Sequence, residues 1–437
     1  MRISVERHDM QRSLKNFVLE GISSQITYSL ITATVISSYL ATIKAPPFVI
    51  GLVVAIPHLT TTAQLISAKF VEKRNRKKIA IVASFTAKLS LFAIALTSFI
   101  NGETEVFLFS LFYLTFNVCE DIFTVTWSSW MRDLIPGGKR GELLSKRSAY
   151  GRIIATFFLF PQIWIFGILD KVAFSVLFLL SAIIGVFGVY FLSNIENAKS
   201  KRVSEAKLKD PLKNSNFLKL AILVSLFCFT LSSARTFFAV YLIEVLFYPL
   251  WAVVMLMFIA HLSSIYSFRI AGTFSDRVGN KPLLSTSFIV FSISAIFFAI
   301  SNPQTGILPL LIAYLLHGFY TSAPTIAFMN AVADLTHKKH SAPFFAFGNW
   351  LQDVFSAMGC VFAGFIISAL YYTSFSYQIL FLISSFISIS LLPFLRFYDE
   401  FSMPTIKAIR KYPSIVFEDF ISLRRAIGNF GKRRELY

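Results

Sequence analysis

The side chains with the clearest chemical potential are ionisable groups inside long apolar stretches. Glu120 and Asp121 stand side by side in one stretch, Lys88 lies in the stretch before it, and Arg235 and Asp353 lie in the second half of the chain. A charge at the centre of a bilayer costs roughly 2.5–3.5 kcal/mol on insertion scales. Retaining several such charges therefore indicates charged partners or a water-filled cavity within a membrane.

Two of these groups are predicted to form an ion pair. Glu120 lies about ten residues into its stretch and Lys88 about nine into the preceding one, so at ~1.5 Å of rise per residue their depths match. Adjacent residues point about 100° apart around a helix, so only one of Glu120 and Asp121 is expected to face Lys88. The other acid is the candidate for protonation, because an unpaired buried carboxylate favours its neutral form. Alternatively, Lys88 and polar neighbours neutralise both acids.

Three further groups are candidates for binding or coupling. Arg235 either holds an anion, compensates a carboxylate that loses its proton, or makes a structural contact between helices. Asp353 sits near mid-depth of its stretch and joins the acids as a coupling candidate. His317 is also at mid-depth, where a histidine can relay protons; the alternative is a hydrogen-bonded packing role.

The apolar stretches that carry these groups are long enough to cross a bilayer. Hydrophobic residues make up 55% of the 437 residues and charged residues only 15%. About 20 residues of helix span a bilayer core of roughly 30 Å. We therefore predict an all-α polytopic membrane protein with twelve transmembrane helices, at about 17–42, 47–68, 79–100, 106–130, 149–168, 172–193, 217–246, 249–270, 283–300, 307–331, 344–369 and 376–395.

The net charge of +18 is distributed as a topology signal. Lys44 and Lys171 are in one set of connections and Lys88, Arg152 and Arg235 within the stretches, while nearly all other Lys and Arg lie in the tails or in, and at the edges of, the alternate connections. The positive-inside rule then places both termini in the cytoplasm. The basicity thus predicts a multi-pass protein of the cell membrane, with a lipid and not a nucleic-acid partner.

The hydrophilic segment 194–216 divides the chain into a bundle at 1–193 and a second at 217–395. We read it as a cytoplasmic linker, either a solvated tether or partly helical. The basic tail at 396–437 contains apolar residues at helical spacing near Arg424 and Arg425. It is predicted either to lie on the anionic inner leaflet as an amphipathic helix or to act only as a solubilising tail.

Two sequence pairs indicate that the bundles are copies of each other. The loop at 272–281 has an eroded basic counterpart at 69–78, 203 positions earlier, and an Asp-Leu run at 133 recurs at 334. The two offsets are nearly equal, and each member lies between or just after long apolar stretches. Duplicated bundles around a central midplane site are the usual architecture of a secondary transporter.

The loop at 272–281 also resembles a known signature. Gly272, Asp276, Arg277, Gly279 and Lys281 stand at the spacing Gly-x-x-x-Asp-Arg-x-Gly-x-Lys, which is similar to the signature loop of the major facilitator superfamily. The Asp-Leu runs resemble that superfamily's loops between helices four and five and between ten and eleven. The resemblance covers essentially the whole chain and implies two pseudo-symmetric six-helix bundles.

The chain departs from the superfamily pattern in its first half. Lys73 and Arg76 stand where the second copy has Asp276 and Gly279. In the superfamily, the acidic residue of this loop pairs with the N-terminal end of a helix in the opposite half, where the helix dipole favours a carboxylate. We therefore predict an asymmetric inner gate based on Asp276, facing 148–151. Alternatively, Asp276 and Arg277 only cap their own helices.

The resemblance also implies which helices line the central cavity, namely one, four, seven and ten. Polar side chains on these helices are the candidates for substrate contact, and Glu20 with Arg152 is the candidate pair for the inner gate. The substrate-cavity candidates are Gln25, Tyr28, Asn117, Trp127, Arg235, Tyr314 and Tyr320.

The sequence motifs do not indicate an enzyme. The three cysteines fall inside apolar stretches without metal-ligand spacing, and no Gly-x-Ser-x-Gly turn or nucleotide loop Gly-x-x-x-x-Gly-Lys-Ser/Thr occurs. We expect neither a metal nor a cofactor, and an ion gradient as the energy source.

We therefore expect a monomeric symporter or antiporter that moves a small organic solute by alternating access, coupled to protons, with a lean to efflux. Uptake of an organic acid or another nutrient through Arg235 is the alternative. A receptor or scaffold that keeps a transporter fold without pumping is the alternative of another class.

Overall fold

The computed structural model describes residues 2–71, 75–134, 143, 147, 150–151, 153–169, 171–197, 210–336, 341–370, 373 and 375–398. Every regular element in these ranges is helical. Arg152, most of the linker and the tail from 399 onward lie outside the described residues. In the first part of the chain, the helices are α1 (Arg2–Leu30), α2 (Ala33–Thr42), α3 (Pro47–Val71), α4 (Arg76–Thr97), α5 (Glu103–Leu134), α7 (Leu159–Ile168) and α8 (Lys171–Ser193).

The second part begins with a short 3-10 turn, η1, and ends with another, η2. Its elements are η1 (Pro211–Lys213), α9 (Ser215–Glu244), α10 (Leu250–Val278), α11 (Asn280–Ile300), α12 (Leu308–Leu335), α13 (Ser341–Ala369), α14 (Ser376–Ser390) and η2 (Leu392–Phe397).

The helices account for the predicted crossings. Ten of them are long and apolar enough to cross a membrane within the described ranges. The first predicted crossing is interrupted at Ile31 and Thr32 into α1 and α2, and the fifth is the shorter apolar helix Ile153–Ile168. The all-α fold is therefore confirmed, with two of the predicted crossings built less regularly than an apolar run suggests.

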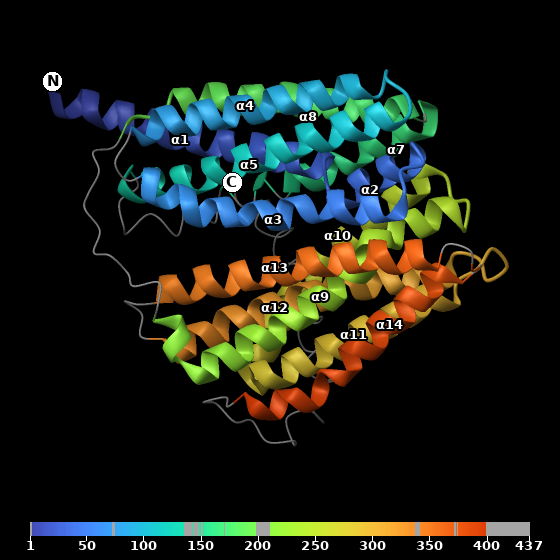
Figure 1. Ribbon diagram of the computed structural model, residues 1–437. Helices are drawn as coiled ribbons and strands as arrows, with labels where there is room; N and C mark the ends of the chain where they lie inside the picture. The colour runs from blue at the N-terminus through green and yellow to red at the C-terminus, as the bar shows by residue number, and fades with distance from the viewer. Residues whose placement is uncertain are drawn as a thin grey trace, which may run out of the picture.

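The helices form two groups, α1–α8 and α9–α14, which lie one above the other in Figure 1. In the first group α4 packs against α5 and α8, and in the second α12 packs against α10 and α11. The groups meet where α3 packs along α13, α7 along α10 and α2 along α9. The predicted boundaries at 193 and 217 stay a prediction.

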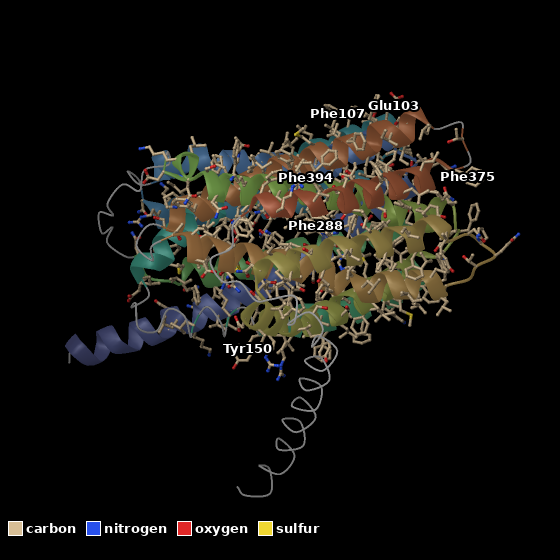
Figure 2. The ribbon with its side chains drawn as sticks, turned by 90° about the horizontal axis from the view of Figure 1, so that it is seen from below. Glu103, Phe107, Tyr150, Phe288, Phe375 and Phe394 are labelled. Carbon is tan, nitrogen blue, oxygen red and sulfur yellow. The ribbon has the colours of Figure 1, made fainter. Side chains whose placement is uncertain are left out.

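The outer surface of the helices is apolar. Phe107, Phe375 and Phe394 are 66%, 66% and 55% exposed, and Phe107 and Phe375 lie at the margin of the molecule in Figure 2. Phe288, by contrast, is fully buried. Large exposed apolar areas are unusual on soluble monomers, so these side chains are suited to contact with lipid tails.

A close approach between the two groups depends on glycines. A Cβ placed on Gly51 of α3 would lie 2.5 Å from the carbonyl oxygen of Cys360 and 3.0 Å from the Cα of Gly364, both in α13. A Cβ on Gly364 would in turn lie 2.8 Å from the carbonyl oxygen of Pro47. Small residues let helix backbones approach closely in membranes, where van der Waals packing drives association.

We predict that Gly51→Ala lowers the thermal stability of the protein in detergent. The added methyl group meets backbone atoms that cannot rotate away, and overpacking of this kind typically costs about 1–3 kcal/mol. Gly167→Ala is the matched control, because a Cβ at Gly167 of α7 meets nothing within 4 Å. An equal Tm for Gly51→Ala and the original protein would show that α3 and α13 do not depend on this contact.

Candidate functional site

A cavity of about 500 Å³ lies between the two groups of helices. Its walls come from α1, α2, α3 and α5 on one side and from α9, α12 and α13 on the other. The volume is within the roughly 300–1,000 Å³ of small-molecule sites. Polar lining residues include Tyr28, Thr32, His58, Asn117, Ser232, Arg235, Tyr320, Thr321, Gln352 and Ser356.

The backbone is irregular at three places where it lines this cavity. Thr32 separates α1 from α2, and its hydroxyl caps α2 by accepting a hydrogen bond from the backbone N–H of Val35 at 3.4 Å. Pro57 lies inside α3 and Pro324 inside α12. Proline removes a helix hydrogen bond, and irregular backbone at membrane depth is tolerated where it lines a water-filled cavity. These three positions therefore mark a polar interior.

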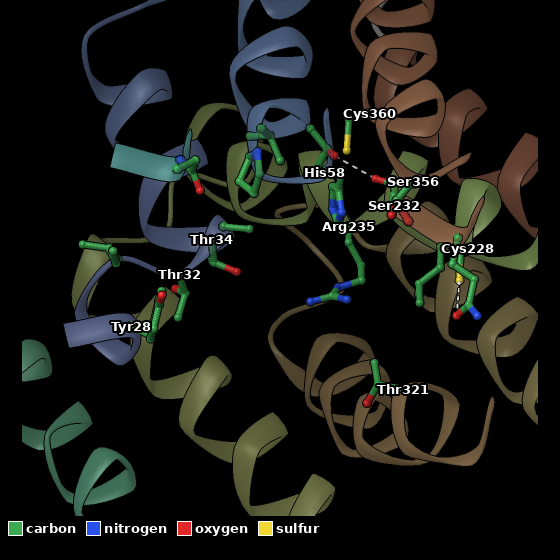
Figure 3. Close-up of a pocket in the computed structure, with 18 of the residues that line it drawn as sticks. Tyr28, Thr32, Thr34, His58, Cys228, Ser232, Arg235, Thr321, Ser356 and Cys360 are labelled. Carbon is green, nitrogen blue, oxygen red and sulfur yellow. Dashed lines mark hydrogen bonds between the residues drawn. The ribbon is translucent and has the colours of Figure 1, made fainter. Parts of the chain in front are cut away.

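Arg235 extends from α9 into the cavity. Figure 3 shows its guanidinium in the space between Tyr28 and Thr32 on one side and Thr321 on the other. Its side chain is exposed, and none of the described residues forms a hydrogen bond or an ion pair with it. The structure thus places Arg235 on the cavity wall as a positive charge available to a bound molecule.

Lys88 and Glu120 form a buried ion pair between α4 and α5. Both residues are at most 5% exposed, and the second oxygen of the carboxylate accepts a hydrogen bond from the hydroxyl of Tyr28. Gly185 in α8 leaves room for the stem of Lys88, because a Cβ there would lie 2.7 Å from its Cδ. Of the two adjacent acids, Glu120 is the one that contacts Lys88.

Asp121 points to a different neighbour. Its Oδ1 accepts a hydrogen bond from Gln64 Nε2 of α3 at 2.6 Å, and its buried Oδ2 has no hydrogen-bond partner among the described residues. The charged form of a buried carboxylate is less stable when no cation lies beside it than when the carboxylate is paired with a cation. Asp121 therefore fits the predicted role of the acid that takes up a proton, which stays a prediction.

Asp353 contacts His58 across the boundary between the groups. Its Oδ1 lies 2.9 Å from His58 Nδ1, and both side chains are about one-third exposed, at 31% and 33%. His58 was not among the residues that we expected to act. The signal in the sequence is weak, because it consists only of a histidine after Pro57 at mid-depth of the second stretch.

Four predicted site residues lie away from the central cavity. Gln25 lines a second cavity of about 360 Å³ between α1, α7 and α10. Tyr314 is buried against Phe298, with ring centroids 5.6 Å apart. His317 packs edge-on against Tyr320, and its Nδ1 has no partner among the described residues. A helix that lines a cavity also packs against neighbours, so a polar type does not reveal which face it occupies.

Trp127 is the fourth of these residues, and it belongs to a cluster with Phe17 of α1 and Arg147. It stacks on Phe17 at 5.6 Å and lies 4.3 Å from the guanidinium carbon of Arg147. Arg147 Nη2 donates to Glu20 Oε2 at 2.9 Å, and Ser24 donates to the other oxygen of Glu20 at 2.7 Å. Glu20 thus has a basic partner five positions before the predicted Arg152, which lies outside the described residues.

The signature loop joins helices of the second group to each other. Gly279 ends α10 with a φ of +103°, which favours glycine. Ser275 Oγ donates to Asn280 Oδ1 at 2.6 Å and accepts from Asn330 of α12 at 2.9 Å, and Lys281 donates to the carbonyl oxygen of Tyr398. These bonds fix the end of α10 against α11, α12 and η2.

The predicted gate itself is not tested. Asp276 and Arg277 are exposed at the end of α10, while Ser148, near their expected contact, lies outside the described residues. In the first-half loop, Arg76 Nη1 donates to the carbonyl and hydroxyl oxygens of Ser129 in α5, both at 2.9 Å. The arginine at the position of Gly279 is therefore anchored within its own half.

Known families and structures agree with this architecture. A family model described as Major Facilitator Superfamily matches residues 18–359 and 267–434. No curated protein matches the chain.

Solved structures are similar to the chain in fold at low identity. A mutant of the nucleoside transporter NupG has a TM-score of 0.73 and 14% identity, covering 88% of this chain and 100% of that one. An inward-facing bacterial homologue of the human lysosomal transporter Spinster has a TM-score of 0.64 and 13% identity, with coverages of 89% and 95%. The xylose transporter XylE from E. coli, partially occluded and inward open, has a TM-score of 0.64 and 13% identity, with coverages of 91% and 99%.

We predict that Lys88→Met destabilises the protein by about 3–5 kcal/mol, because it leaves Glu120 buried without its cation. The double variant Lys88→Met/Glu120→Gln is expected to recover most of this loss, since it removes the unpaired charge as well. Unfolding of the purified protein in detergent measures both, with Lys219→Met on the exposed side of α9 as the control. A double variant no more stable than Lys88→Met would contradict the assignment of an ion pair.

Proposed function

Because this chain belongs to the major facilitator superfamily, we propose that it is a secondary active transporter that moves a small organic solute across the cell membrane by alternating access, coupled to protons. The observation that carries the proposal is the cavity of about 500 Å³ with walls from both groups of helices. A site shared by two bundles opens to one side or the other when the bundles rock against each other.

The two groups are tightly packed against each other at one end of their boundary. Gly51 and Gly364 approach closely at one end of α3 and α13, and Phe160 packs against Phe258 of α10 with ring centroids 4.8 Å apart. With the termini in the cytoplasm, as the basic residues predict, this closed end faces outward. The two groups also touch farther along α3 and α13, where Trp350 Nε1 donates a hydrogen bond to Thr62 Oγ1 at 3.3 Å.

Proton coupling is supported by two acids in different settings. Asp121 has a buried oxygen without a partner among the described residues, and Asp353 contacts His58 between α13 and α3. Protonation of Asp353 or of His58 changes the charge on a contact that joins the two halves, so it favours one arrangement of the halves over another. One charge moved across 100 mV supplies roughly 2.3 kcal/mol, which supports about a fifty-fold solute gradient.

The direction of transport is left to experiment. The lean to efflux has no support in a particular contact of the described residues, whereas Arg235 on the cavity wall favours the organic-acid alternative. A receptor or scaffold without transport is the contrasting outcome.

The full chain reconstituted in vesicles with an internal pH dye tests the proposal. We predict that a solute which exchanges across the membrane also moves protons, and that Asp121→Asn reduces this proton movement to background while solute exchange persists. Asp353→Asn is expected to weaken both, because it also changes the contact with His58. Asp210→Asn, at the start of η1, is the matched control.

Proton movement that survives neutralisation of Glu120, Asp121 and Asp353 together would contradict these acids as coupling sites. A solute that binds but is never exchanged would favour the alternative that the protein is a receptor without transport activity.

A further inference from the structure

We propose that the central cavity selects an organic monoanion, with one carboxylate or similar anionic group on a compact apolar body, and that Arg235 binds the anionic group. The inference rests on the proposed transport function and names the class of its substrate.

Arg235 supplies the charge for such a site. Its guanidinium carries five N–H donors in a planar fork that matches the two oxygens of a carboxylate. The side chain extends into the cavity and has no hydrogen-bond or ion-pair partner among the described residues. The exposed guanidinium is therefore available to a bound anion, with which it can form charge-assisted hydrogen bonds.

Two other acids near the cavity are already engaged with basic side chains of the protein. Glu120 is paired with Lys88 and bonded to Tyr28, and Asp353 contacts His58. Within the described part of the wall, Arg235 is the one permanently charged residue, and the wall contains no Asp, Glu or Lys. The wall therefore favours a negative ligand, and a cation has no carboxylate to bind there.

The number and type of the remaining groups set the rest of the ligand. One guanidinium balances one negative charge. Phe116 and Phe227 on opposite sides, with Leu231 one turn before Arg235 on α9, provide apolar surface for an organic body. Ser232 also lines the cavity, and its hydroxyl group can donate to an anionic oxygen.

Binding to the purified full-length protein tests this inference with two matched sets of probes. The first set is benzoate, benzamide and benzylamine; the second is hexanoate, hexanamide and hexylamine. At pH 7.5 each set keeps one body and carries a charge of −1, 0 or +1. Calorimetry is expected to show binding of at least one anion, with its neutral and cationic counterparts at least about tenfold weaker, since charge-assisted hydrogen bonds are lost.

Variants then assign the selectivity to Arg235. Arg235→Gln is expected to weaken the binding of the anion by about tenfold or more, to the level of its neutral counterpart. Arg235→Lys keeps the charge but not the fork, so it should fall between the two. Lys219→Gln, on the same helix but exposed outside the cavity, should bind like the original protein.

Three binding results would overturn the inference: no anion of either set binds at tens of millimolar, a neutral or cationic probe binds as tightly as its anion, or Arg235→Gln binds the anion unchanged. The order of affinities in the original protein decides the first two even where a variant fails to fold. If the vesicles exchange a neutral solute, this inference is overturned and the transport proposal stands. If the protein binds an anion but does not exchange it, the transport proposal is overturned and this inference stands.

Discussion

The high cost of a charge in an apolar medium is the constraint on which this structure depends. Lys88 and Glu120 lie deep in the first group of helices, where neither side chain reaches bulk water. Their mutual contact and the hydroxyl of Tyr28 satisfy the carboxylate on both oxygens. Because breaking such a pair leaves an uncompensated charge, the pair fixes α4, α5 and α1 in one register. Tyr28 also lines the cavity, so the same contact connects the core of this half with the candidate site.

The same cost explains where the backbone departs from regular helix. A helix satisfies its own N–H and C=O groups, and an interruption at membrane depth exposes some of them. The break at Thr32 and the prolines at 57 and 324 all lie on the cavity wall, on both sides of it. Polar space in the cavity thus makes these interruptions tolerable. It also keeps the Arg235 guanidinium accessible to a ligand.

The fold followed from the sequence more fully than the site did. Apolar runs of about 20 residues and the alternating basic connections predict the crossings because they report on each helix alone. Equal depth on neighbouring helices was enough to propose a partner for Lys88, although only the structure assigned Glu120 and not Asp121. The contact of His58 with Asp353 joins residues 295 positions apart in different halves. No periodicity within either helix encodes it, and the same holds for the burial of Tyr314.

The α3–α13 pair brings packing and titratable chemistry together. Gly51 and His58 are separated by about two turns of α3, so roughly 10 Å separates the closest backbone approach from the histidine. When two halves rock about a close contact, atoms farther along the same helices move more than those at the contact itself. The distance between His58 and Asp353 therefore depends on the tilt of the halves. By linkage, a proton that binds one tilt more strongly also stabilises it. In the proposed mechanism, this one pair of helices therefore connects proton binding to the opening of the cavity.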